Sequence, residues 1–312
     1  MTPADIAASA FGGRVLRLIK ARENEVYEVE LPSGRAALRL HRTGYQSAAA
    51  IRSELWWCDA LAAGGVPVPR PLRTLSGDML AEAGGRFASA VGWLDGQPIG
   101  EAGVPLAGST ADQAALYRNL GRLLAQVHSV TDNLTLPAWF ERPRWDFDGL
   151  LGEQPFWDRF WEHPALDPQE ADIALRTRDF LRERIGGHAQ RAPVRLIHAD
   201  VLRENVFSGA DGLSLIDFDD SGYGYALYDL GTALAQSLKE PALPAIAAGL
   251  AEGYGESQPI DAEMIPVFTL MRCCASVGWM IPRLQSGDPV IRRHIERMTT
   301  LAVPMLAGKM PW

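Results

Sequence analysis

The sequence predicts an α+β protein with two lobes, a small antiparallel sheet with one helix and then a larger, mostly helical part. Three observations support this. Short segments rich in Val, Leu and Ile fill the first third of the 312 residues, helical periodicity dominates after Trp93, and a few short strands interrupt the helices near residue 200. We therefore place one lobe at residues 1–92 and the other at residues 93–312.

The first lobe shows partial alternation of apolar and polar residues, which is typical of strands. The Pro and Gly of Leu31-Pro-Ser-Gly-Arg35 suit a hairpin turn. Ser47 can cap a helix that runs to about Ala63, because apolar side chains recur there at helical spacing. The strands are expected at residues 14–20, 25–31, 35–41, 78–82 and 86–91.

The second lobe shows apolar residues at intervals of three and four, which predicts amphipathic helices. Residues 137–168 are rich in Trp, Pro and Asp, and we expect them to be irregular. The helices are expected at residues 113–130, 168–185, 226–238, 241–254, 261–284 and 289–306, with strands at 195–198, 206–208 and 213–217.

Composition limits the class of protein. Apolar residues make up 47% and charged residues 22%, which is ordinary for a globular chain. The net charge of −8 argues against a nucleic-acid partner. No run approaches the ~18 apolar residues of a membrane span, and no signal peptide begins the chain, so we expect no membrane partner. Cys58, Cys273 and Cys274 form neither a disulfide framework nor a metal motif, which favours a reducing cytoplasm.

The most informative motif has the form H-x-D-x-x-x-x-N and consists of His198, Asp200 and Asn205. A hydrophobic strand that leads to Asp217 follows it. Kinase-type phosphoryl transfer needs one carboxylate at the acceptor hydroxyl, and it needs an amide oxygen and a second carboxylate to hold Mg²⁺ against the nucleotide phosphates. The alternative is a surface loop in which Asp and Asn only form turns. The spacing and the strand before Asp217 favour the first interpretation.

Three runs resemble the aminoglycoside phosphotransferase, choline kinase and homoserine kinase group, whose members share the protein-kinase-like fold. They are Ile197-His-Ala-Asp-Val-Leu-Arg-Glu-Asn205, Leu215-Ile-Asp-Phe-Asp-Asp220 and Tyr228-Asp-Leu-Gly231. The resemblance covers about residues 14–300. It implies that Asp200 accepts or orients the acceptor proton and that Asn205 and Asp217 bind Mg²⁺. It also implies that His198 and Asp229 support the loop.

The nucleotide side departs from the kinase pattern, because no Gly-rich loop joins the first two strands. A polar turn, Ala21-Arg-Glu-Asn-Glu25, stands there instead. The resemblance implies that Asn24 faces phosphate, and an ordinary hairpin tip is the alternative. Arg39 occupies the strand position of the usual phosphate-pairing Lys, and Glu54 on the next helix would pair with it. A surface salt bridge is the alternative for this pair, and Lys20 and Arg42 are rival candidates for the phosphate-pairing cation.

The connection Ala90-Val-Gly-Trp-Leu-Asp-Gly96 is expected to join the lobes. Its backbone could bind adenine through the amide and carbonyl groups of Trp93 or Leu94. The alternative is a plain strand end followed by a turn.

Asp219, Asp220 and Tyr223 follow the expected metal ligand within one short loop. Carboxylates and aromatic faces attract ammonium groups, so these residues are expected to contact a cationic acceptor. Secondary metal contacts or a solvated turn are the alternatives for the two Asp residues. Cations from Arg203, Arg272 and Arg283 would instead favour an acidic or zwitterionic acceptor.

The resemblance implies a kinase that moves the γ-phosphoryl group of ATP or GTP to a hydroxyl of a small molecule, with Mg²⁺ as cofactor. An amino alcohol, an amino acid or an aminoglycoside-like molecule is the expected acceptor. A Ser/Thr protein kinase is one alternative, but only ten residues separate Asp217 from Tyr228 and leave no room for an activation-loop insertion. A nucleotide-binding module without turnover is another, supported only by Arg39. A metal hydrolase would leave unexplained the pair of Arg39 and Glu54 and the spacing between Asp200 and Asn205.

Overall fold

The computed structural model describes residues 1–21 and 23–312 and divides the chain into two compact units. The first unit comprises residues 1–97, 133–142 and 207–219, and the second comprises residues 98–132, 143–206 and 220–312. The chain therefore passes from one unit to the other five times. The first unit thus extends past residue 92, where the sequence places the end of the first lobe, and takes in two later segments.

The first unit contains an antiparallel sheet with the strand order β1-β2-β3-β5-β4. Leu31 pairs with Gly34 across a two-residue loop, which confirms the predicted hairpin. Gly34 has φ of 117°, a conformation that glycine adopts at no steric cost. The strands are β1 (Arg14–Ala21), β2 (Glu25–Leu31), β3 (Gly34–Leu40), β4 (Leu80–Ala83) and β5 (Arg86–Gly92).

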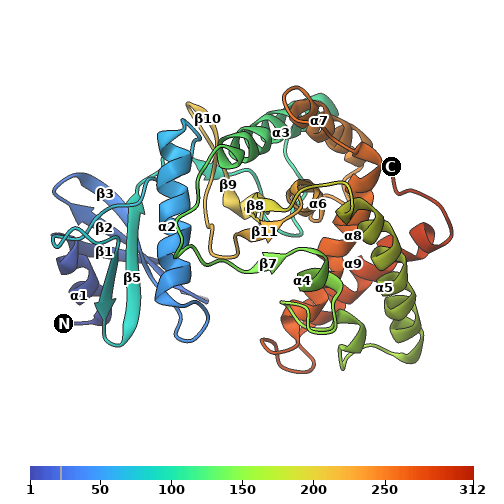
Figure 1. Ribbon diagram of the computed structural model, residues 1–312, viewed down its shortest axis with the longest axis horizontal. Helices are drawn as coiled ribbons and strands as arrows, with labels where there is room; N and C mark the ends of the chain where they lie inside the picture. Colours follow the sequence, from blue (N-terminus) through green and yellow to red (C-terminus); the bar gives the residue numbers. More distant parts are fainter. Residues whose placement is uncertain (22) are drawn as a thin grey trace. The chain divides into compact units, whose positions relative to one another are not determined.

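Helices cover both faces of this sheet (Figure 1). On one face, α1 (Pro3–Ala10) packs small alanines against Leu38 and its neighbours on β3. On the other face, α2 (Ala48–Ala63) packs Ile51 against β4 and β5. We did not predict α1 from the sequence, although Thr2 and Asp5 form a capping box at its start.

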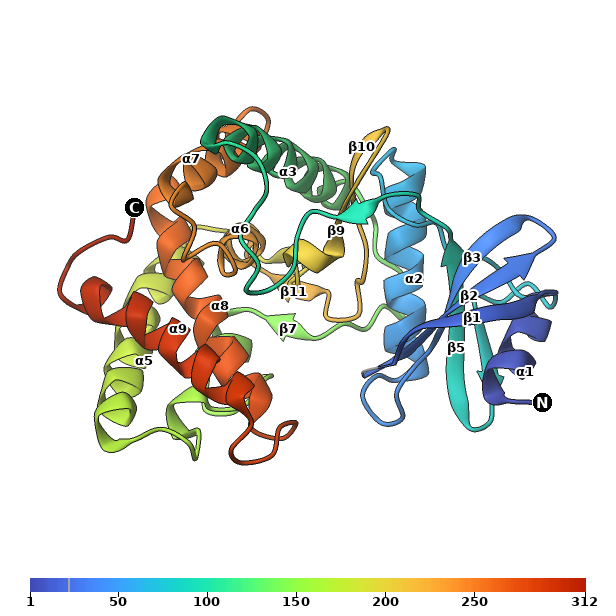
Figure 2. The ribbon, with the colours of Figure 1, turned by 180° about the vertical axis from the view of Figure 1, so that it is seen from behind.

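The second unit is mainly helical. In both views α3 and α7 run side by side (Figures 1 and 2), and α8 packs against α6 and α9. None of the helices in the described part of the chain is long and apolar enough to cross a membrane. The main helices are α3 (Thr110–Asp132), α5 (Pro168–Ala189), α6 (Ala226–Leu234), α7 (Leu243–Gly255), α8 (Ile265–Met280) and α9 (Pro289–Leu306).

Short elements connect these helices. The strand order β7-β11-β8 joins β7 (Arg144–Trp145), β11 (Gly222–Gly224) and β8 (Arg195–Ile197). A further small sheet has the order β10-β9-β6, and its β10 and most of its β9 belong to the first unit. The remaining elements are β6 (Gln97–Pro98), β9 (Val206–Gly209), β10 (Gly212–Leu215), α4 (Phe147–Leu151), η1 (Phe160–Glu162), η2 (Arg203–Asn205) and η3 (Ala262–Met264).

Three predicted elements have wrong boundaries. The strand expected to reach Asp217 ends at Leu215, because φ of 64° at Asp217 is incompatible with a strand. The helix expected at residues 261–284 begins as η3 and continues as α8, which has Pro266 in its first turn and ends at Met280. The helix expected to reach residue 238 ends at Leu234. The segment at residues 137–168, expected to be irregular, contains β7, α4 and η1.

Candidate active site

The loop that follows β8 is held from behind by one buried carboxylate. Asp229, in the first turn of α6, accepts the backbone N–H of His198 at 2.9 Å and that of Ala199 at 2.7 Å. Its Oδ2 also lies 3.1 Å from Nε2 of His128 on α3. Ala199 has φ of 65°, a strained conformation that these two hydrogen bonds stabilise. The loop therefore presents the next residue, Asp200, in one fixed direction.

Both carboxylate oxygens of Asp200 have a donor. Its Oδ2 accepts the side-chain amide of Asn205 at 2.8 Å, and its Oδ1 accepts a guanidinium N–H of Arg272 on α8 at 2.6 Å. The backbone N–H of Asp200 donates to Nδ1 of His198. Such charge-assisted contacts fix the orientation of a carboxylate. Asp200 is therefore preorganised before any acceptor arrives.

Arg272 is almost completely buried. Burial opposes its charge, but the carboxylate of Asp200 raises the pKa of the guanidinium above its usual range. The guanidinium also lies over the ring of Trp157, 4.8 Å from the ring centroid. The sequence singled out Arg272 as a cation for the acceptor, and the structure makes it a partner of Asp200.

Asn205 suits a metal ligand. Its amide nitrogen donates to Oδ2 and to the backbone oxygen of Asp200, which leaves its carbonyl oxygen for another partner. Among the described residues, no group of three His, Cys, Asp or Glu side chains could hold a metal ion unaided. An amide carbonyl oxygen is a ligand that Mg²⁺ accepts beside one or two carboxylates, substrate phosphates and water.

Within the first unit, Arg39 lies among three carboxylates. Alternation along β3 turns Leu38 toward α1 and Arg39 toward α2, where Arg39 Nη1 lies 3.1 Å from Oε1 of Glu54. Its Nη2 lies 2.8 Å from Oδ1 of Asp217, and its Nη1 lies 3.8 Å from Oδ1 of Asp219. Burial opposes its charge, yet the three carboxylates raise the pKa of Arg39 above its usual range.

Two guanidinium groups, those of Arg39 and Arg142, lie beside the three carboxylates of this group. Burial raises the pKa of the Glu54 carboxyl to about 7, although the guanidinium of Arg39 opposes this shift. Arg142 lies at the edge of the group, 4.0 Å from Glu54. A carboxyl group with the pKa of Glu54 carries only part of a negative charge near neutral pH, so the two guanidinium groups largely balance the three carboxylates.

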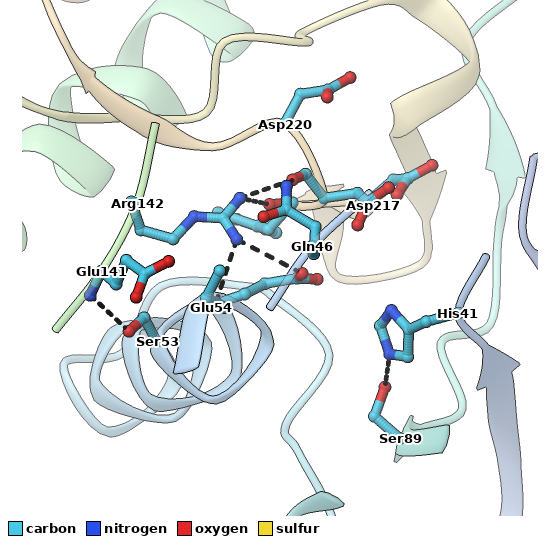
Figure 3. Close-up of polar contacts among 12 residues, drawn as sticks. His41, Gln46, Ser53, Glu54, Ser89, Glu141, Arg142, Asp217 and Asp220 are labelled. Atoms are coloured by element: carbon cyan, nitrogen blue, oxygen red, sulfur yellow. Dashed lines mark hydrogen bonds and ion pairs between the residues drawn. The ribbon is translucent and has the colours of Figure 1, made fainter. Parts of the chain in front are cut away.

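A strained turn presents these carboxylates. Asp217 has a positive φ, and the next side chain, Phe218, packs edge-on against Trp57 of α2. Arg142 holds the turn by donating to the backbone oxygens of Phe218 and Asp219, at 3.1 Å and 2.5 Å. Figure 3 shows its guanidinium between this turn and the helix that carries Glu54. We did not single out Arg142 from the sequence, because it lies in a segment without a recognisable pattern.

Asn24 belongs to the same group of residues. Its amide nitrogen donates to Asp219 Oδ2 at 3.1 Å, and its side-chain oxygen accepts the backbone N–H of Arg42. Arg22, within the polar turn expected at residues 21–25, lies outside the described residues. Asp219, expected to contact the acceptor, lies instead with Asn24 and Arg39 in the part of the first unit predicted to bind nucleotide.

Trp93 and Leu94 follow β5. The backbone N–H of Trp93 donates to the carbonyl of Arg35 at 3.3 Å, and the Arg35 guanidinium lies over the Trp93 ring. The amide expected to face adenine is therefore engaged with β3, and Leu94 is the better candidate in this connection.

The remaining predicted acceptor residues lie in the second unit. The backbone oxygen of Asp220 accepts the indole N–H of Trp145, and the Tyr223 backbone N–H donates to Pro143. Burial raises the pKa of the Tyr223 hydroxyl. Arg203 is wrong as a cation for the acceptor, because its buried guanidinium pairs with Glu240 at 2.8 Å.

A family model and curated relatives match most of this chain. The family model described as phosphotransferase enzyme family matches residues 15–265. Homoserine kinase of Methylobacterium radiotolerans is 29% identical over 236 residues, which cover 72% of this chain and 65% of that enzyme. Amicoumacin kinase of Bacillus subtilis is 26% identical over 76% of this chain and 68% of that enzyme. The chain thus spans less than two thirds of the length of the homoserine kinases that it matches.

Solved structures show the same fold. A microcompartment-associated aminopropanol kinase superposes with a TM-score of 0.83 at 26% identity, over 98% of this chain and 97% of that one. An amicoumacin kinase in complex with AMP-PNP and Ca²⁺ gives a TM-score of 0.70 at 21% identity, over 91% and 87% of the two chains. These likenesses confirm the protein-kinase-like fold predicted from the sequence.

Proposed function

Because the chain belongs to the phosphotransferase enzyme family, we propose that it transfers the γ-phosphoryl group of ATP or GTP to a hydroxyl of a small molecule. The observation that carries the proposal is the fixed carboxylate of Asp200, held by Asn205 and Arg272. Homoserine, amicoumacin and aminopropanol kinases are among its relatives and neighbours, which supports an acceptor with an amino group.

In the proposed reaction, the acceptor oxygen attacks the γ-phosphorus while its proton passes to the Asp200 carboxylate. The bond between the γ-phosphorus and the bridging oxygen breaks, and the nucleoside diphosphate leaves with that electron pair. The transition state is loose, so a carboxylate of ordinary basicity suffices if it is well positioned. Asn205 and Arg272 supply that positioning.

The residues around Arg39 would bind the nucleotide phosphates. The carbonyl oxygen of Asn205 and the carboxylate of Asp217 would hold Mg²⁺, which would offset the phosphate charge. Arg39 would pair with the phosphates, and Glu54 would orient it. We assign Asp219 to this phosphate and metal group, whereas Asp220 and Tyr223 remain proposed acceptor contacts. The three cysteines are buried and free, which supports a cytoplasmic location.

Two isosteric or truncating variants test this assignment. Asp200→Asn should lower kcat by about 10³-fold or more, because the variant side chain cannot take a proton, and should leave nucleotide affinity within a few-fold. Asp217→Ala should instead abolish the strengthening of nucleotide binding by Mg²⁺. Turnover is measured by a coupled assay over amino alcohols, amino acids, sugars and aminoglycosides, and binding by titration of a fluorescent nucleotide.

The two variants serve as each other's control, since each should lose a different property. A folded Asp200→Asn protein that turns over normally would disprove the assigned role of Asp200. Loss of nucleotide affinity in that variant would show that Asp200 belongs to the nucleotide site instead.

A further inference from the structure

The loop from His198 to Asn205 has two halves with different partners. Its first half, which carries Asp200, is held by Asp229 and Arg272. Its second half is the short helix η2, which ends at Asn205, the proposed metal ligand. The two residues of η2 before Asn205 have their own set of contacts, all of them within the second unit.

Arg203, the first residue of η2, is a buried cation with 2% of its surface exposed. Its Nη2 donates to Glu240 at 2.8 Å and to the hydroxyl of Ser237 at 3.0 Å, both just beyond α6. Its Nη1 donates to the backbone oxygen of Val104 at 2.9 Å. One planar guanidinium therefore joins η2 to two segments that lie far apart in the sequence.

Glu204 makes a second link between the same two segments. Its Oε1 accepts the backbone N–H of Ala102 at 2.8 Å, and its Oε2 accepts the side-chain amide of Gln236 at 2.9 Å. The side-chain oxygen of Gln236 in turn accepts the backbone N–H of Arg203 at 3.0 Å. Both residues that precede Asn205 are therefore fixed from two sides.

The buried pair of Arg203 and Glu240 is better explained by geometry than by stability. Their side chains are 1% and 7% exposed, and the loss of hydration of two such charges consumes most of their mutual attraction. A well-packed apolar pair would often be as stable. The guanidinium, however, has its donors in a fixed plane, and Glu240 is itself held because it accepts the backbone N–H of Leu106 at 2.9 Å.

We propose that Arg203 and Glu204 are positioning residues for the metal, because they hold η2 so that the carbonyl oxygen of Asn205 stays oriented for Mg²⁺. This inference rests on the proposed function, in which Asn205 binds that ion. The amide nitrogen of Asn205 already donates to Asp200, so a rotation of η2 would displace the carbonyl oxygen or break that bond. The two halves of the loop thus have separate roles, one in proton transfer and one in metal binding.

The test separates metal binding from folding. Arg203→Met/Glu240→Gln removes both charges of the pair together and keeps an acceptor for the backbone of Leu106, so the protein should still fold. The Mg²⁺ concentration that gives half of the strengthening of nucleotide binding should rise about tenfold or more, as it does when a metal ligand loses its supporting contacts. Nucleotide affinity without Mg²⁺ should not change. Titration of a fluorescent ATP analogue, without acceptor, measures both quantities.

Two single variants extend the test. Arg203→Lys should recover part of the Mg²⁺ response, because an ammonium group can reach Glu240 but cannot also span the other two acceptors. Glu204→Ala removes a less buried contact and should raise the Mg²⁺ requirement in the same direction by a smaller factor. It keeps the test valid if the double variant does not fold.

Arg178→Met/Glu153→Gln is the matched control, because it makes the same substitutions in an ion pair of the second unit whose partners lie outside the loop. Arg272→Lys should give the opposite result, a lower kcat at saturating Mg²⁺ with an unchanged Mg²⁺ requirement.

An unchanged Mg²⁺ requirement in the folded variants of Arg203 and Glu204 would overturn the inference. An equal loss of nucleotide affinity with and without Mg²⁺ would also overturn it, because that result indicates a general structural effect. A raised Mg²⁺ requirement without phosphorylation of any acceptor by the wild-type protein would support the positioning role and contradict the proposed function alone.

Discussion

Arg39 replaces the lysine that the resemblance implies at its position, and its contacts show what the replacement provides. The two terminal nitrogens of its guanidinium reach Glu54 and Asp217 separately, at 3.1 Å and 2.8 Å. A lysine ammonium is a single point of charge and cannot span two carboxylates in this planar way. The side chain therefore links α2 to the turn that carries the proposed metal ligand.

Substitutions at Arg39 should separate the effect of its positive charge from the effect of its planar guanidinium geometry. Arg39→Ala should lower kcat/KM for the nucleotide by about 10²-fold or more, because it removes the phosphate-pairing cation. Arg39→Lys should retain only part of the activity, because the ammonium cannot make both contacts. Steady-state kinetics check this, with thermal unfolding as a measure of folding. Arg52→Ala, which removes an exposed pair with Asp78 on the same unit, is the control.

Wild-type kinetics for Arg39→Ala would show that Arg39 and Glu54 form only a structural ion pair. The phosphate-pairing cation would then have to be sought elsewhere in the first unit.

Residues that depend on a short motif could be predicted from the sequence, and residues that depend on distant contacts could not. His198, Asp200 and Asn205 lie within one loop, so their spacing alone indicates a shared site. Arg272 is separated from Asp200 by 72 positions, and Arg142 from Asp219 by 77. Arg142 also binds backbone oxygens, which every residue type offers, so no complementary residue in the sequence marks its partner.

Glycines allow the backbones of α3 and α7, the two helices with the most extensive contact, to lie very close together. A Cβ at Gly253 would lie 1.9 Å from the backbone oxygen of Arg118, and one at Gly249 would lie 2.3 Å from that of Ala114. On the opposing helix, a Cβ at Gly121 would lie 2.3 Å from the backbone oxygen of Leu250. No side chain can intervene at these positions, so the two helix backbones touch.

Alanine at two helical glycines should therefore have opposite effects. Gly253→Ala should lower the free energy of unfolding by about 2–4 kcal/mol, because backbone atoms cannot move aside for the added methyl group. Gly187→Ala in α5 meets nothing within 4 Å and should be neutral or stabilise by up to about 1 kcal/mol through helix propensity. Urea unfolding measures both. Similar values for the two variants would show that the α3–α7 contact is more adaptable than its geometry indicates.

Long elements with clear periodicity could be predicted well, whereas short ones could not. The predicted helix at residues 289–306 coincides with α9, because apolar residues recur there over five turns and Asp288 caps the start. β7 has two residues and β11 has three, which is too few to show any alternation. These strands depend on the pairing of β11 with β7 and with β8, tertiary contacts that local sequence does not encode.

Buried histidines make the whole molecule sensitive to acid. Burial, with a further contribution from Arg39, lowers the pKa of His41 to about 3, and burial lowers that of His294 to about 4. In the unfolded chain both rings would titrate near the ordinary pKa of about 6.5. Unfolding therefore takes up protons below that pH.

Because the unfolded chain binds more protons, the free energy of unfolding falls as the pH is lowered. The stability that neutral His41 contributes is complete above pH ~6.5 and is lost as the pH falls toward ~3, at up to about 1.4 kcal/mol per pH unit. His41→Gln should make the free energy of unfolding less dependent on pH by that amount. Urea unfolding at several pH values between 7.5 and 4 measures the slope. Parallel slopes for wild type and variant would mean that His41 does not carry this linkage.

The division of the first unit into three stretches of chain has a consequence for synthesis on the ribosome. Residues 1–97 leave the exit tunnel first, but Arg142 and the turn at Asp217 complete the packing around Arg39 and Glu54. Helices α3 and α5 of the second unit are translated before that turn. A multidomain chain usually folds its first domain before the next one is made. Here the strands of the sheet all lie within residues 1–97, but the group of charges around Arg39 is complete only after Asp219 has been added.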